Sequence, residues 1–205
     1  MAAVEEAPDV IWIPPVPREE IEPVNAVRGY VFVSGRPWLR QRGLLDRYME
    51  LLPQELHRRF DEITALEWVP IDEAMLSYAV CDRMELSSKE MRELGAFVSA
   101  ANNGAFVETL ARLAGGFGIS PWVALKSLHK VWPRSNRGGA VAVYRVADRE
   151  ARIELWNVPM VRSRFFCVSF CGALEHGLAL FRRNASVTEI ESESAGDDIA
   201  LRATW

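Results

Sequence analysis

The chain has 205 residues, of which 49% are hydrophobic and 25% are charged, with a formal net charge of -4 at neutral pH. This length allows one domain with a sizeable core and is marginal for two domains. The acidic balance, without a contiguous basic stripe, argues against a nucleic-acid-binding protein, because phosphate contacts need clustered Lys and Arg.

The cysteine count and the N-terminus indicate the compartment. Cys81, Cys167 and Cys171 are odd in number and too few for a disulfide framework. The first residues lack the basic and apolar regions of a signal peptide, and no apolar stretch approaches the ~20 residues of a membrane span. We therefore predict a cytoplasmic protein without a membrane span.

Residues 1–25 form a predicted N-terminal arm, and residues 26–205 a single predicted α+β domain. The arm should be extended because it is rich in glutamate and in prolines, which include Pro14, Pro15, Pro17 and Pro23. Its apolar trio, Ile11-Trp12-Ile13, leaves two alternatives. The arm docks on its own domain, or it is a short motif offered to a partner or a neighbouring subunit.

The next part of the chain is predominantly helical by its apolar periodicity. Residues 27–33 indicate a strand or the entry into a helix. One helix is expected from Trp38 to about Leu52, and a second begins at Pro53. Asp72 can cap a third helix, whose apolar positions are Met75, Leu76 and Val80.

Two capping motifs predict further helices. Ser87-Ser-Lys-Glu90 matches a capping box, and the helix that follows should be interrupted at residues 102–104, Asn-Asn-Gly. The glycines of residues 115–118 should end the next helix. Ser120-Pro121 then starts a helix that should stop at Pro133 and carry one stripe formed by Trp122, Leu125, His129 and Trp132.

After Gly139 the pattern changes to strands. Residues 140–146 and 151–158 form a predicted hairpin, residues 161–183 a largely buried helix, and residues 186–193 and 199–205 two more strands. The predicted fold is therefore N-terminal helices followed by strand-strand-helix-strand-strand, an antiparallel four-stranded sheet packed on helices. Trp156 should point away from the face of Ile153 and Leu155, so the sheet should be partly covered on both sides.

Several phrases, in this order, carry a resemblance to a known family. They are Met91-Arg-Glu-Leu-Gly95, residues 120–132, Gly139, Gly172-Ala-Leu-Glu-His-Gly177 and the closing Trp205. Over about residues 27–205 the chain resembles a family of uncharacterised myxobacterial proteins known as a domain of unknown function. That family is similar to the 4-vinyl-reductase-type domain, and through it to haem-NO-binding sensors and to small core subunits of the TRAPP tethering complex.

The resemblance implies an α+β fold with an apolar pocket between helices and sheet, used for ligand sensing or for protein contact. The chain departs from it near the last two strands. The 4-vinyl-reductase-type domain typically carries cysteines there, whereas this sequence has Glu189, Glu191, Ser192 and Glu193. The metal chemistry that those cysteines suggest does not carry over.

Residue patterns typical of catalysis are missing. The sequence has no G-x-S-x-G elbow, no phosphate loop and no H-E-x-x-H motif, so we predict no catalytic residues and no enzyme. Cys167 and Cys171 are one helical turn apart, but a metal site needs further ligands such as Cys81 or His176, and buried small residues explain the pair as well. We predict no metal. His57, His129 or His176 could ligate haem, but the sequence has no C-x-x-C-H motif for haem attachment. We predict no cofactor.

The aromatic content is the strongest functional signal. The chain has seven tryptophans and nine phenylalanines, which either pack solidly or line a cavity. We predict a non-catalytic regulatory or sensory protein that binds a small apolar ligand in a pocket between helices and sheet. The residues predicted to line this pocket are Trp122, His129, Trp132, Phe166, Phe170 and Leu174. The alternative is an adaptor that acts through homodimerisation and through its N-terminal arm on a protein partner.

Overall fold

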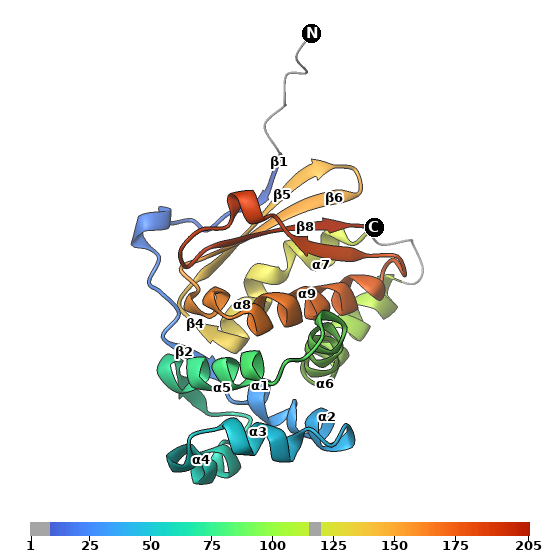
Figure 1. Ribbon diagram of the computed structural model, residues 1–205. Coiled ribbons are helices and arrows are strands. Elements are labelled where there is room, and N and C mark those ends of the chain that lie inside the picture. The colour runs from blue at the N-terminus through green and yellow to red at the C-terminus, as the bar shows by residue number, and fades with distance from the viewer. Residues whose placement is uncertain (1–8, 115–119) are drawn as a thin grey trace.

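The computed structural model describes residues 9–114 and 120–205, with residues 103–114 described by their backbone alone (Figure 1). The predicted end of a helix at residues 115–118 lies outside the described residues. An antiparallel sheet lies at one end of the molecule, and the long helix α9 (Arg164–Ala179) crosses beneath it. The helices of the N-terminal half lie below α9, so the predicted α+β class is confirmed.

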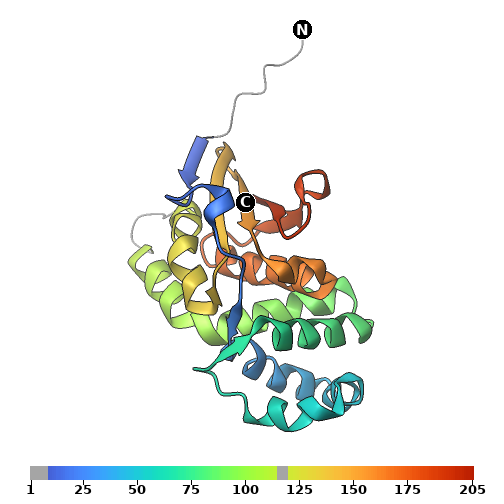
Figure 2. The ribbon, with the colours of Figure 1, turned by 90° about the vertical axis from the view of Figure 1, so that its left-hand side faces the viewer.

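The main sheet contains the predicted strands and one more. Its order is β1-β5-β6-β8-β7, with β1 (Asp9–Trp12), β5 (Ala140–Ala147), β6 (Glu150–Trp156), β7 (Ser186–Glu189) and β8 (Ile199–Thr204). β1 comes from the N-terminal arm and runs antiparallel to β5, with Val10 opposite Tyr144 and a register shift before Trp12. Part of the arm is thus a strand of its own chain's sheet (Figure 2).

Both faces of this sheet are covered, as the position of Trp156 predicted. Ile153 and Leu155 point into the main core against α9, whereas Trp156 packs on the other face with Ile21 and Ala142. The guanidinium of Arg18 lies 5.1 Å from the centre of the Trp156 ring. The segment that follows β1 therefore shields the second face of the sheet.

The first predicted helices are shorter than the periodicity suggested. Residues 27–33 contain both predicted elements, a strand and a helix, and the helix expected over residues 38–52 is broken. The break occurs at Gly43, whose φ of 68° favours glycine and ends a helix. The elements are β2 (Ala26–Arg28), α1 (Tyr30–Val33), α2 (Arg36–Gln41), α3 (Leu45–Leu51) and α4 (His57–Glu62).

Helix α5 (Ile71–Arg83) confirms two of the three predicted apolar positions, since Val80 is buried and Met75 packs against the core. Leu76 is 44% exposed, while Ala74, Tyr78 and Cys81 are buried at the spacing i, i+4, i+7. Asp72 lies in the first turn, where its charge favours the helix start, but the position before the helix is Pro70. Position 78 therefore faces the interior.

Helix α6 (Ser88–Ala114) confirms the capping box and contradicts the predicted break at residues 102–104. The backbone N–H of Ser87 donates to Glu90 and that of Glu90 donates to the Ser87 hydroxyl. Asn102 stays helical because its side-chain amide donates to the Val98 carbonyl and to the Ser34 hydroxyl. This bond to a distant residue cannot be read from local sequence.

The helix predicted from Ser120 to Pro133 consists of two pieces. Helix α7 (Trp122–Lys126) ends at Ser127, and α8 (Leu128–Ser135) continues through Pro133 for two more residues. The Ser127 hydroxyl donates to the Val123 carbonyl, and a side chain that bonds backbone in this way bends a helix. The predicted single stripe is therefore divided between two helices.

A second, three-stranded sheet was not predicted from the sequence. β2 lies between β3 (Trp68–Pro70) and β4 (Asn136–Arg137), all antiparallel. The Trp68 ring is held between the guanidinium groups of Arg28 and Arg137, at 3.8 and 4.4 Å from the ring centre. This small sheet joins the helical half to the strand-rich half.

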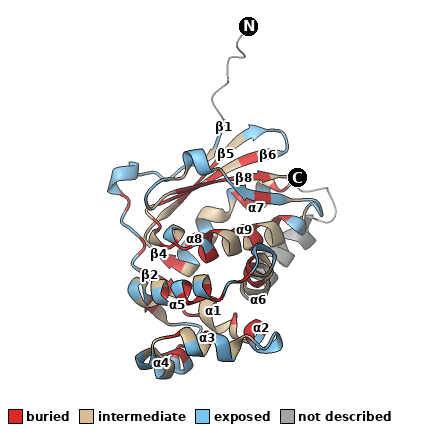
Figure 3. Cartoon of the chain, viewed as in Figure 1, coloured by how far each residue is buried: buried red, intermediate tan, exposed pale blue. Residues whose placement is uncertain are grey.

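Helices α6 and α9 approach closely enough that their backbones touch. A Cβ atom on Gly95 would overlap the backbone of Ser169, and one on Gly172 would overlap the backbone of Arg92. The buried residues concentrate between the sheet and α9, whereas the outer surfaces of α3 and α4 are mostly exposed (Figure 3). This contact fixes one wall of a cavity that Gly95 and Ser169 line.

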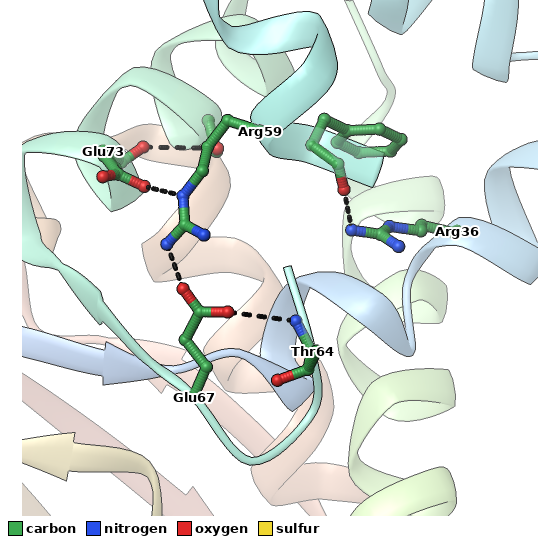
Figure 4. A network of polar contacts seen from close by, with 7 residues as sticks. Arg36, Arg59, Thr64, Glu67 and Glu73 are labelled. Carbon is green, nitrogen blue, oxygen red and sulfur yellow. Dashed lines mark hydrogen bonds and ion pairs between the residues drawn. The ribbon is translucent and has the colours of Figure 1, made fainter. Parts of the chain in front are cut away.

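A polar network fastens α4 to the elements beside it (Figure 4). Arg59 contacts Glu67 and Glu73, and Glu67 also accepts a bond from the Thr64 backbone N–H. Nearby, the Arg36 guanidinium donates to the Phe60 carbonyl. The network holds the lobe formed by α2, α3 and α4 against β3 and α5.

Candidate functional site

The larger of two neighbouring internal cavities has a volume of about 190 Å³. It lies between the lobe of α2–α4 on one side and α5, α6, α8 and α9 on the other. Its walls are mainly apolar side chains, with a few hydroxyl groups, among them those of Tyr30, Tyr48 and Tyr78. We call it the lobe cavity.

The second cavity, of about 150 Å³, lies between α7, α8, α9 and β5 and is called the sheet cavity. Trp132 and Phe170 line both cavities and separate them. Trp132 donates its indole N–H to the Gly138 carbonyl, so its polar atom is satisfied away from the cavities. Its ring meets Phe170 edge-on at 6.3 Å.

An aromatic wall continues from this pair into the lobe cavity. Phe170 stacks on Phe166 at 5.6 Å, and Phe166 meets Tyr78 edge-on at 5.6 Å. Ser163 caps α9 by accepting a bond from the Phe166 backbone N–H, which fixes the helix start. The i, i+4 spacing of Phe166, Phe170 and Leu174 then places all three on one face.

Charge is excluded from both cavities. Among the described residues, no Asp, Glu, Lys, Arg or His lines either cavity. Burial raises the pKa of Tyr48 and Tyr78, and it also raises the pKa of Cys81, which keeps these groups neutral. The arrangement suits binding of an apolar molecule and supplies no charged acid-base group.

The structure brings four of the six predicted ligand-lining residues to the cavities. Trp132 and Phe170 line both, Phe166 lines the lobe cavity and Leu174 lines the sheet cavity. These four come from α8 and α9, the two helices that lie directly beneath the sheet. Whether they bind a ligand stays a prediction.

Trp122 and His129 do not line either cavity. Trp122 packs edge-on against Trp205 and donates its N–H to the Asp148 carbonyl. His129 stacks on Trp12, with ring centres 3.7 Å apart. Leu125 and Trp132, three residues further along the same two helices, do line the sheet cavity, so the difference arises within each helix.

The tyrosines of the helical lobe were not among the residues predicted from the sequence. Tyr78 is 6% exposed and lines the lobe cavity together with Tyr30 and Tyr48. The burial of Tyr78 could have been predicted from the i, i+4, i+7 spacing of Ala74, Tyr78 and Cys81, which indicates one face of a helix. The placement of Tyr30 and Tyr48 depends on the lobe packing and has no comparable local signal.

The cysteines do not form a metal site within the described part of the chain. No group of three or more His, Cys, Asp or Glu side chains there could hold a metal ion. Cys167 donates its thiol to the Val161 carbonyl, and burial raises the pKa of Cys167 to about 12 and that of Cys171 to about 11. These thiols behave as small buried side chains.

Comparison with known proteins gives structural relatives only. No family model matches the chain, and no curated protein matches it. The resemblance to a myxobacterial family therefore stays a prediction. Among the described helices, none has both the length and the apolar character needed to cross a membrane.

The fold is similar to that of solved H-NOX domains. An Fe(II) unliganded H-NOX mutant from K. algicida is 12% identical, with a TM-score of 0.60, and the match covers 86% of this chain and 95% of that one. An oxygen-binding H-NOX domain related to soluble guanylate cyclases is 18% identical, with a TM-score of 0.57, over 86% and 94% of the two chains. A T. Tengcongensis H-NOX mutant is 18% identical, with a TM-score of 0.56, over 86% and 96%. These likenesses establish a shared fold.

Haem distortion is described for other structural neighbours of this fold. Haem iron is held by His, Cys thiolate, Met or Tyr. Among the described residues, no His or Met lines either cavity, and residues 103–119 contain neither. Burial favours the neutral thiol of Cys81 and the neutral phenol of Tyr78. Burial also favours the neutral phenols of Tyr30 and Tyr48, so the described side chains that line these two cavities do not fit a haem.

Proposed function

We propose that this protein is a non-catalytic sensory or regulatory protein that binds a small apolar molecule between α8, α9 and the helices of the N-terminal half. The lobe and sheet cavities are the proposed binding site. Trp132, Phe166, Phe170 and Leu174 are the residues from the sequence prediction that we place in it.

The observation that carries this proposal is the pair of adjoining cavities that no charged side chain of the described residues lines. An apolar cavity of about 150 Å³ stays dry and binds benzene. Each cavity here is of that size or larger, and the aromatic wall between them offers ring faces and edges to a ligand. A molecule of about one ring fits without movement of the backbone.

The H-NOX neighbours support a sensory role by analogy of fold. One of them is an oxygen-binding domain in complex with oxygen, so this fold holds a small ligand in that protein. Fold alone does not define function, and the ligand is argued here from the cavities. Haem is not part of the proposal because the side chains do not fit it.

Isothermal titration calorimetry with benzene tests the proposal. We expect saturable binding to the wild type and loss of binding in Ala173→Phe, because Ala173 lines both cavities and a phenyl ring would fill them. Ala179→Phe is the matched control, since Ala179 lies on the same helix and is exposed. If Ala173→Phe does not fold, Ala173→Leu serves the same purpose. Absence of benzene binding to the folded wild type would contradict the proposal.

The adaptor alternative has less support in the structure. Its motivating feature was the apolar trio of the arm, and Ile11 and Trp12 pack against this chain's own core. The homodimer, the protein partner and the cytoplasmic location stay predictions of the sequence.

A further inference from the structure

The lobe cavity contains a deeply buried tyrosine whose hydroxyl group is not used by the fold. Tyr78 is 6% exposed, and its ring is surrounded by those of Phe32, Phe165 and Phe166 at 5.6 to 6.2 Å. Such apolar packing holds the ring in place. The only polar atom of the side chain is then the hydroxyl oxygen.

That hydroxyl has no hydrogen-bond partner among the described residues. The polar side-chain atoms there that are both fully buried and without a partner belong to Arg36, His129, Arg145 and Arg152, and not to Tyr78. The hydroxyl oxygen of Tyr78 therefore keeps some accessible surface. Tyr78 is also one of the residues that line the lobe cavity. Buried polar groups are normally paired, and each exception needs an explanation.

Burial raises the pKa of all three tyrosines that line the cavity. Hydrogen bonding by Ser135 opposes this rise for Tyr30, and hydrogen bonding by Ser77 opposes it for Tyr48. For Tyr78 the neighbouring Cys81, Tyr30 and Tyr48 raise the pKa further.

The lining of the lobe cavity also limits the charge and the size of a ligand that could contact Tyr78. No charged side chain among the described residues lines the cavity, so an anionic or cationic ligand would be buried without a partner, at a large cost. The volume of about 190 Å³ holds about one ring and a few further atoms.

We propose that the lobe cavity binds an uncharged molecule with an apolar body and one acceptor oxygen, such as a ketone, which accepts a hydrogen bond from the Tyr78 hydroxyl. This inference rests on the proposed function, because it names the ligand class of the same site. The apolar body contacts the aromatic wall, and the oxygen satisfies the group that the fold leaves unpaired.

Calorimetry with a matched pair of probes tests it. Acetophenone carries a C=O group where α-methylstyrene carries C=CH2, so the two have almost the same shape. We expect acetophenone to bind the wild type more tightly, by about 3- to 10-fold, the range that one net hydrogen bond supports. Benzoate, which is charged, should not bind measurably.

Variants assign the preference to one hydroxyl group. Tyr78→Phe should lose the preference for acetophenone, whose carbonyl would then be buried without a partner, and should keep the wild-type affinity for α-methylstyrene, which also shows that the cavity is intact. Tyr144→Phe is the control, because Tyr144 lies on β5 outside both cavities and should retain the preference.

The outcomes separate this inference from the proposed function. If both probes bind the wild type equally, or if Tyr78→Phe retains the preference, the ligand class is wrong while the cavity still binds apolar molecules. If neither probe nor benzene binds, the proposed function fails and this inference fails with it. Tight binding of benzoate would overturn the exclusion of charge.

Discussion

The indole ring of Trp12 lies flat against the imidazole of His129, with ring centres 3.7 Å apart and planes inclined by 16°. Trp12 belongs to β1 in the N-terminal arm, and His129 belongs to α8, one turn before Trp132 at the two cavities. This contact joins the arm to the helix that lines the proposed binding site. His129 thus contacts the arm and not the cavities.

Trp12→Ala should weaken the docking of the arm. Loss of the stacked pair and of apolar contact should lower the free energy of unfolding by about 1–2 kcal/mol, measured by urea denaturation. Ile13→Ala is the control, because Ile13 is 45% exposed and should change stability little. His129→Phe should retain stability, since the imidazole has a sealed nitrogen without a partner and a phenyl ring keeps the stacking. Equal losses in Trp12→Ala and Ile13→Ala would refute the role of the contact.

The crossing of α6 and α9 should not tolerate a methyl group. In Gly95→Ala the new Cβ overlaps the Ser169 backbone, so we expect a loss of about 1–3 kcal/mol from overpacking. Gly177→Ala on the same α9 is the matched control, because a Cβ there meets nothing within 4 Å. That variant should gain up to about 1 kcal/mol from helix propensity. Thermal unfolding of both variants measures the contrast, and a neutral Gly95→Ala would contradict the close approach.

The polar network of α4 should make a modest, pH-dependent contribution. Arg59→Gln removes the contacts with Glu67 and Glu73 and should cost about 1 kcal/mol or less near neutral pH. The bond to Arg59, followed by that from the Thr64 backbone, lowers the pKa of Glu67. The stabilisation is therefore present above the ordinary pKa of 4.5 and is lost as the pH falls below it. Arg58→Gln is the control, because Arg58 is 87% exposed and pairs only with Glu62.

For that network, urea denaturation at pH 7 and at pH 3 is the measurement. The difference between wild type and Arg59→Gln should shrink at the lower pH, while Arg58→Gln should stay close to wild type at both. A constant difference across this range would show that Arg59 acts through packing and not through its charge.

The buried thiols should make the protein less stable at alkaline pH. Burial raises the pKa of Cys167 to about 12 and that of Cys171 to about 11, above the ordinary value of 9.0. The unfolded chain then loses these protons first, so the free energy of unfolding falls as the pH rises from about 9 towards 11. Cys171→Ala should reduce this slope in urea denaturation at pH 7, 9 and 10.5. Native protein at pH 8 should react slowly with iodoacetamide, and rapid labelling would contradict the burial of these thiols.

Much of the strand-rich half could be predicted from local sequence. The alternation of Ile199, Leu201 and Ala203 and the apolar face of Phe166, Phe170 and Leu174 identify β8 and α9, because a period of two or of 3.6 follows from backbone geometry alone. The capping box of Ser87 is equally local, since its partner Glu90 is three residues away.

Other features depend on residues far apart in the sequence. Val27 lies opposite Asn136 in the small sheet, and Asn102 is kept helical by Ser34, so neither the sheet nor the uninterrupted α6 has a local signal. The arm becomes a strand only because β5 presents a free edge beside it.

The candidate site shows the same division. The sequence by itself determined the strand-strand-helix-strand-strand order and the aromatic face of α9, which follow from periodicity. Only the tertiary structure decided that Trp132 and Phe170 line both cavities, that His129 faces Trp12, and that Tyr78 lines the lobe cavity. The physical reason is that a cavity is the space left between elements, and its lining is set by how they pack and not by the pattern within any one of them.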